Sequence, residues 1–180
     1  MKMKNQIKQI STGNFGTIFL FKNGKAIEYL KDSNQNPSKI QIENIQKGRN
    51  INSKNPNEFI NISSLIEDPN DRIIQDIVSG ARAVYLLTSN QNAYGIGLND
   101  NGQLGFDTET LGKTEKPILM MKNISKIFSG IASLSVFLLN SNQELFGCGD
   151  NQLGQLGLGE SRIKEKAIQK INQNPKYSKR

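Results

Sequence analysis

One stretch of the chain occurs twice, and this repetition limits the fold more than any other feature. Residues 93–106 read AYGIGLNDNGQLGF and residues 145–158 read LFGCGDNQLGQLGL. A shift of 52 positions superposes seven pairs of identical residues. The pairs are Gly95, Gly97, Asn99, Gly102, Gln103, Leu104 and Gly105 with Gly147, Gly149, Asn151, Gly154, Gln155, Leu156 and Gly157. Self-similarity at such a spacing is typical of solenoids, propellers and other repeat arrays.

Each copy reads as a short strand that leaves through tight turns. The apolar and aromatic lead-in suits a half-buried strand. The glycines that follow accept positive φ angles, and Asn99 and Asn151 can bond their own downstream backbone. Leu104 and Leu156 are the large apolar residues inside this turn sequence. We therefore predict that the two leucines pin the turns to a core and that the repeat motif is structural.

A second pair of matching features precedes each copy. Ser79-Gly80 corresponds to Ser129-Gly130 at a spacing of 50, and the apolar runs 84–87 and 136–139 correspond at a spacing of 52. One copy therefore carries two extra residues in the intervening turn. Gly80 and Gly130 thus belong to the repeated motif, and the repeated unit is predicted to contain several strands.

The order of these features resembles the repeat of the regulator of chromosome condensation family, the RCC1 repeat. Its pattern is Ile-x-x-Ile-x-x-Gly, an apolar strand, a polar turn, aromatic-x-x-Gly-x-Asn-x-x-Gly-Gln-Leu-Gly, and a Pro-led strand. Residues 74–123 and 124–174 fit this pattern. The resemblance implies an all-β propeller of four-stranded blades, about seven of them in the family.

The remaining segments are interpreted against that repeat. Residues 1–73 form a degenerate first repeat, in which Asn23-Gly24 predicts a hairpin turn with positive φ at both central residues. Residues 31–57 are rich in Asn, Gln, Lys and Ser, as in a long polar loop or an eroded part of the blade. An outer strand is expected at 59–66, before a turn cluster at 67–71. Residues 175–180 form a basic tail.

The sequence thus predicts a partial β-propeller of about three RCC1-type blades, the first degenerate. Strands are expected near 73–78, 83–88, 92–96, 118–121, 124–128, 134–140, 144–148 and 167–171, with Pro117 opening the fourth of these. An open arc leaves two blade faces without a neighbour. Three explanations stay open: a fragment of a larger propeller, completion of the ring by another copy or a partner, and a short arc with modified ends.

Charge is distributed unevenly over the 180 residues. The formal net charge is +7, but residues 61–160 carry 6 Lys or Arg against 11 Asp or Glu. Residues 161–180 carry 7 against 1, namely Arg162, Lys164, Lys166, Lys170, Lys176, Lys179 and Arg180 against Glu165. Basic ends suit nucleic acid or an acidic partner, but no aromatic ladder accompanies them, and a solvated tail is the preferred interpretation.

The composition also predicts the surroundings of the chain. Its single cysteine excludes an internal disulfide, which favours a reducing intracellular compartment, cytoplasmic or nuclear. No apolar run approaches the roughly 20 residues that cross a bilayer, so no membrane contact is expected.

Catalytic chemistry has little support in the sequence. There is no His, which removes imidazole base catalysis and most zinc sites, and we expect neither a cofactor nor a metal. Cys148 lies between two glycines and is interpreted as a small apolar filler. Carboxylate pairs such as Asp107 and Glu109 lie in polar loops, as solvent-facing charges do.

A binding function is therefore predicted. Loops carry recognition in propellers, so the candidate partner-binding residues are Asp107, Glu109, Lys113, Glu160 and Arg162. The leading hypothesis is a non-enzymatic scaffold that docks a protein partner. The resemblance implies the alternative, a guanine nucleotide exchange factor or regulator for a small GTPase that is also associated with chromatin.

Overall fold

The computed structural model describes residues 6–13, 16–29, 59–158 and 164–171, and these residues form three four-stranded antiparallel sheets. Blade A contains β1 (Ile7–Gly13), β2 (Gly16–Phe21), β3 (Ala26–Tyr29) and β4 (Phe59–Asn61). Blade B contains β5 (Ile74–Ser79), β6 (Ala83–Thr88), β7 (Ala93–Leu98) and β8 (Lys113–Met121). Blade C contains β9 (Ile124–Phe128), β10 (Ser135–Asn140), β11 (Leu145–Asp150) and β12 (Lys164–Lys170).

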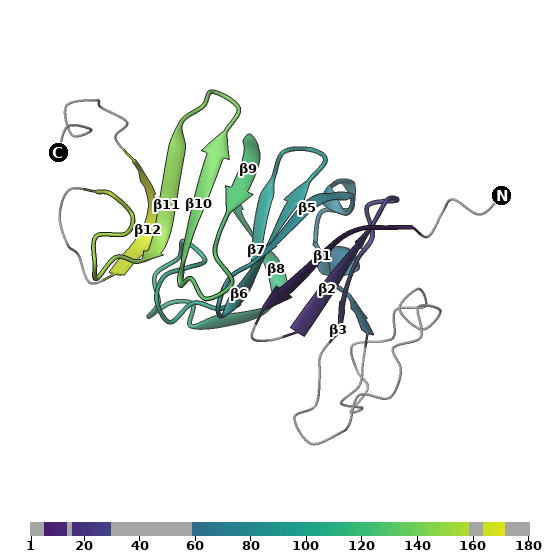
Figure 1. Ribbon diagram of the computed structural model, residues 1–180, viewed down its shortest axis with the longest axis horizontal. Coiled ribbons are helices and arrows are strands. Elements are labelled where there is room, and N and C mark those ends of the chain that lie inside the picture. Colours follow the sequence, from purple (N-terminus) through teal and green to yellow (C-terminus); the bar gives the residue numbers. More distant parts are fainter. Residues whose placement is uncertain (1–5, 14–15, 30–58, 159–163, 172–180) are drawn as a thin grey trace, which may run out of the picture.

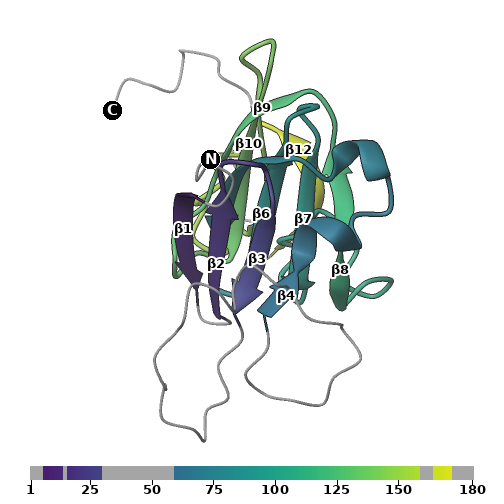
Figure 2. The ribbon, with the colours of Figure 1, turned by 90° about the vertical axis from the view of Figure 1, so that its right-hand side faces the viewer.

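The blades stand side by side in sequence order, each with its first strand at one edge and its fourth at the other (Figure 1). Figure 2 looks onto blade A, with the strands of the other blades behind it. Sequential strands pair within a sheet, and stacked sheets bury the faces between them, as in a propeller. The predicted all-β fold with a partial propeller of about three blades is confirmed.

Two apolar cores lie between the blades. The core between A and B contains Ile18, Leu20, Ala26, Ile62, Ile66, Ile74, Ile77, Val84, Leu86 and Tyr94. The core between B and C contains Ala83, Tyr85, Leu87, Ala93, Leu104, Ile124, Ile127, Val136, Leu138 and Cys148. Successive residues of a strand point to opposite faces, so β6 supplies Val84 and Leu86 to one core and Tyr85 and Leu87 to the other.

The hairpins between the second and third strands of the blades share one turn geometry. In blade A the Gly24 amide donates to the Phe21 carbonyl at 2.9 Å, and the Phe21 amide donates to the Lys25 carbonyl at 2.9 Å. Gly24 has φ +80°, but the φ angle of Asn23 is not positive. The predicted turn with two positive φ angles is therefore wrong. The loop has three residues and one left-handed position, a geometry that forms a bulge.

The turn cluster before blade B also differs from the expectation. The strand predicted at 59–66 ends at Asn61, and two short 3₁₀ helices follow, η1 (Ile62–Leu65) and η2 (Pro69–Asp71). Ile62 and Ile66 are fully buried in the core between A and B. The turned segment therefore contributes both isoleucines to that core.

The fourth strand of blade B is longer than predicted. It begins at Lys113 rather than near Ile118, so Pro117 lies inside β8 and does not open it. Because β8 is the edge strand of its sheet, a residue without an amide donor is tolerated there.

Candidate functional site

A groove of about 740 Å³ lies between the turn segment 67–71, which connects blades A and B, and β8 of blade B. Both walls carry charge. The lining residues are Glu67, Asp68, Asp71, Asn92, Tyr94, Lys113, Thr114, Glu115, Lys116, Pro117, Ile118, Leu119 and Lys122.

Asp71 fixes the wall of the groove that the turn segment forms. Its carboxylate is 3% exposed and accepts hydrogen bonds from the Tyr94 hydroxyl at 2.6 Å and from the Asn92 side-chain amide at 2.7 Å. The Asn90 amide at 3.0 Å and the Thr88 hydroxyl at 3.5 Å complete the set. Burial raises the pKa of the Asp71 carboxyl, but the hydrogen bonds together outweigh burial and hold its pKa below the ordinary value. Asp71 is therefore an anion at neutral pH that ties η2 to the β6–β7 hairpin.

Tyr94 is the partner of Asp71 inside the groove. Burial, and after it the hydrogen bond and charge of Asp71, raise the pKa of the Tyr94 hydroxyl well above its ordinary range. The hydroxyl therefore remains a donor throughout the physiological pH range.

Replacing Tyr94 by phenylalanine tests this contact. Loss of a hydrogen bond to a buried charge is expected to lower the free energy of unfolding by about 2 kcal/mol at pH 7. A carboxyl whose pKa is lower in the folded state stabilises the fold above its unfolded pKa of about 3.9, and loses this effect as pH falls through the folded pKa. The difference between wild type and Tyr94→Phe should therefore shrink below about pH 4 in urea titrations.

Tyr85→Phe is the matched control for this pH dependence. The Tyr85 hydroxyl is fully buried and donates to the Gln103 carbonyl at 3.2 Å, so its bond involves no carboxylate. The loss in free energy of unfolding caused by Tyr85→Phe should therefore be the same at pH 7 and at pH 3. A Tyr94→Phe effect that is equally independent of pH would contradict the role given to the Asp71 charge.

The wall that β8 forms is cationic at several positions. Lys113, Lys116 and Lys122 line it, and the Lys113 ammonium lies 3.5 Å from the Glu115 carboxylate. Pro117 is buried and Leu119 is 36% exposed, so an apolar strip lies beside the charges. The groove thus presents both signs of charge, with Glu67 and Asp68 on the opposite wall.

The candidate partner-binding residues of the sequence fall in different places. Lys113 lines the groove, whereas Asp107 and Glu109 lie in the loop that leads to β8. The Asp107 carboxylate accepts from the Glu109 amide at 2.9 Å, and its carbonyl accepts from the Leu111 amide at 2.9 Å, which makes this loop a defined turn. Glu160 and Arg162 lie outside the described residues.

The groove residues that the sequence did not single out as binding residues include Asp71, Asn92, Tyr94, Lys116 and Lys122. Asp71 belongs to a turn cluster that the sequence does reveal. Its contact with Tyr94, 23 positions later, depends on how the turn folds against the hairpin, which no local pattern encodes.

The glycines, Asn, Gln and Leu of the repeat motif do not line the groove, and they shape the turns between the third and fourth strands. The Asn99 side-chain oxygen accepts from the Leu104 amide at 2.8 Å, and Asn151 does the same for Leu156 at 2.9 Å. Leu104 is fully buried and Leu156 is 1% exposed. Both leucines therefore anchor their turns to the interior of the protein.

The described part of the chain holds no group of three or more Cys, Asp or Glu side chains that could bind a metal ion. Cys148 is fully buried between blades B and C, and burial raises the pKa of its thiol to about 12, so it stays protonated. None of the described helices has the length and apolarity needed to span a membrane.

Neither a protein-family model nor a curated protein sequence matches the chain. Solved structures, in contrast, do match the chain. Human WBSCR16 matches with a TM-score of 0.68 at 15% identity over 93% of this chain. Prp20p from Saccharomyces cerevisiae matches with a TM-score of 0.70 at 16% identity over 94% of this chain. Yeast RCC1 (Prp20) bound to Kap60 matches with a TM-score of 0.62 at 18% identity over 98%.

The chain spans 39% of the length of each of these structures. At these identities the likeness establishes the fold. The three four-stranded antiparallel sheets of this chain agree with it. The fold that this chain adopts is therefore that of an RCC1-repeat propeller, present as an arc of three blades.

Proposed function

We propose that the chain is a non-enzymatic scaffold that binds a segment of a protein partner in the groove between the 67–71 turn and β8. The observation that carries this proposal is the groove itself, which has acidic residues on one wall and lysines on the other. Its shape does not depend on the partner, because Asp71 and its hydrogen-bond donors fix one wall before binding. A preformed site binds with a smaller entropic cost than one that orders on contact.

The charges indicate what kind of segment fits. Lys116 and Lys122 attract carboxylates, Glu67 and Asp68 attract Lys or Arg, and the strip near Leu119 can take an apolar side chain. A polar extended peptide with charges of both signs meets these demands better than a nucleic acid, whose phosphates would meet the acidic wall. The proposal keeps the predicted intracellular setting, cytoplasmic or nuclear.

Charge reversal of Lys116 tests the groove. Both Lys116 and Lys8 are exposed strand lysines, but only Lys116 lines the groove. Affinity capture with quantitative mass spectrometry should show proteins that wild type and Lys8→Glu retain alike and that Lys116→Glu retains about fivefold less. Identical capture by all three proteins would reject the groove as the binding site.

A small GTPase is the partner class that the likeness to Prp20p suggests, since that structure is described together with its binding to Gsp1p and histones. Gsp1p loaded with fluorescent GDP separates the two hypotheses. Binding without faster nucleotide release supports a scaffold. Release well above the intrinsic rate would establish exchange activity and overturn the non-enzymatic proposal.

A further inference from the structure

The face of blade C that points away from blade B carries an apolar surface, and no blade formed by the described residues packs against it. We define this open face by Phe128, Ile131, Phe137, Leu139 and Leu145. Phe128 is 41% and Ile131 is 63% exposed, and the other three are half-buried. Phe128 pairs with Phe137 across β9 and β10, and Leu139 pairs with Leu145 across β10 and β11, so the members of each pair lie on the same face.

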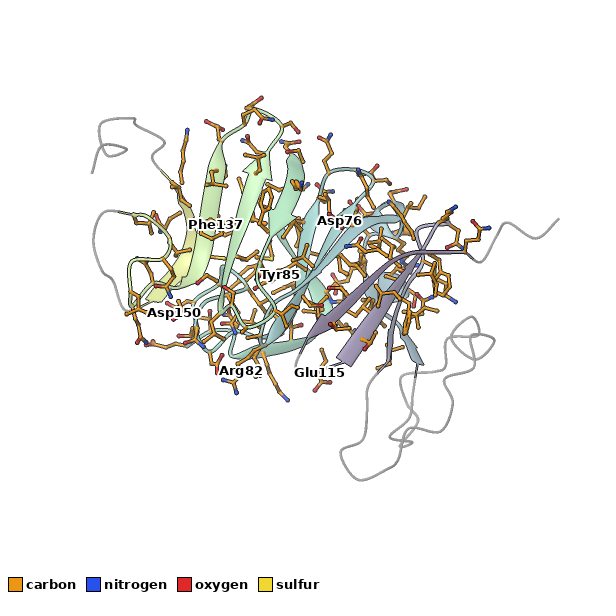
Figure 3. All side chains as sticks on the ribbon, viewed as in Figure 1. Asp76, Arg82, Tyr85, Glu115, Phe137 and Asp150 are labelled. Atoms are coloured by element: carbon orange, nitrogen blue, oxygen red, sulfur yellow. The ribbon has the colours of Figure 1, made fainter. Side chains whose placement is uncertain are left out.

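The internal repeat shows what such a face does in this molecule. In blade B the corresponding residues are Val78, Ala81, Tyr85, Leu87 and Ala93, and Val78 pairs with Tyr85 just as Phe128 pairs with Phe137. Tyr85, Leu87 and Ala93 are at most 3% exposed because blade C covers them. Tyr85 and Phe137 are 52 positions apart and therefore equivalent in the repeat, and Figure 3 labels both.

The open face is also built like its covered equivalent. Around Gly147 the side chains of Phe137, Leu156 and Ile171 converge, as Leu104 and Met120 converge around Gly95 in blade B. The ammonium of Lys126 lies 5.2 Å from the centre of the Phe128 ring, so the cation on this face already has a partner. Exposed contiguous apolar surface of this kind marks an interaction site.

The opposite end of the arc is closed. On the face of blade A that points away from blade B, Phe19 is 8%, Phe21 is 3% and Ile27 is 0% exposed. A second copy therefore cannot use these residues to receive the open face in head-to-tail order. Two copies that each have one closed and one open end can pair only through the open ends, which is a two-fold, self-complementary interface.

We propose that the chain forms a two-fold homodimer in which the open faces of two C blades pack against each other. The contact extends the stack of sheets by face-to-face packing of apolar sheet surfaces, here between two identical faces. It leaves the groove on blades A and B outside the interface.

Sedimentation equilibrium tests this interface with two variants. Wild type from micromolar to about 100 μM is expected to approach twice the chain mass of 20.0 kDa. Ile131→Asp, which places a charge within the apolar contact, at the β9–β10 turn, should raise the dimer dissociation constant at least ~30-fold. Phe128→Ser should also weaken the dimer. Because both side chains are exposed, the circular dichroism and the unfolding midpoint of the monomers should match those of wild type.

Two matched isoleucine variants serve as controls. Ile73 is 56% exposed near the start of blade B, so Ile73→Asp should leave the dimer unchanged. Ile10 is 55% exposed in blade A, and Ile10→Asp would weaken only a head-to-tail contact. A monomeric wild type, a mass that rises beyond the dimer, or a dimer sensitive to Ile10→Asp and not to Ile131→Asp would each overturn the proposal.

Discussion

Replacing Gly149 by alanine is expected to destabilise the protein by at least about 4 kcal/mol. Gly149 has φ +106°, and a Cβ atom at this position would collide with the Leu134 carbonyl oxygen and lie 2.9 Å from the Ser135 Cα. Both neighbours are backbone atoms at the start of β10, so relief requires the strand pair itself to move. The cost is a large share of a domain's stability of about 5–15 kcal/mol, and urea unfolding followed by circular dichroism measures it.

Gly154→Ala separates the steric cost from the conformational one. Gly154 has φ +72°, but a Cβ atom there would meet nothing within 4 Å. Its replacement should cost only about 1 kcal/mol, the penalty of a left-handed backbone. Gly97, the equivalent of Gly149 in blade B, has φ +122°, and a Cβ atom there would lie 2.7 Å from the Arg82 carbonyl oxygen, so Gly97→Ala should also be costly, though less so than Gly149→Ala. Equal costs at Gly149 and Gly154 would contradict this explanation.

Truncation of Leu104 to alanine is expected to cost about 3 kcal/mol. The side chain is fully buried in the core between blades B and C, and its Cδ2 packs against Gly95. The Gln103 carbonyl next to it accepts from the Tyr85 hydroxyl at 3.2 Å, which fixes the turn and keeps it from closing over the cavity. Thermal and urea unfolding of Leu104→Ala should show the loss directly.

Leu156→Ala is the natural comparison, because the repeat places the two leucines in the same turn. Leu156 is 1% exposed but belongs to blade C, where Phe137 and Ile171 surround it at the open face. Side chains at an unpacked face can relax into the space, so we expect a smaller loss, about 1.5–2 kcal/mol, measured at concentrations where the chain is monomeric. A loss at Leu156 as large as that at Leu104 would mean that the open face is as rigid as the inner core.

The sequence predicted the structure correctly where the determining residues lie close together in the chain. The 52-residue repeat predicted two equivalent turns, and the structure shows the same asparagine-to-leucine bond in both. The plugging role of Leu104 and Leu156 followed because each is a large apolar residue among turn formers. The strands of blades B and C followed from runs such as 84–87, whose length and composition suit a buried strand.

The rest depends on tertiary contacts that no short pattern contains. The end of β4 at Asn61 is set by the burial of Ile62 and Ile66 between two blades. The inclusion of Pro117 in β8 depends on that strand being an edge. Likewise, the carboxylate of Asp71 gains its role from donors on a hairpin about 20 residues away, which is why the groove was not predicted from the sequence.

All six residues of β6 are buried, and alternate side chains of this strand enter different cores. Among the described residues neither core holds side chains from both terminal blades, so A and C are connected in series through one sheet. In a linear array with nearest-neighbour energies, a substitution in one terminal blade influences the other only by changing the stability of the middle one. The central sheet thus couples the stabilities of the two terminal blades.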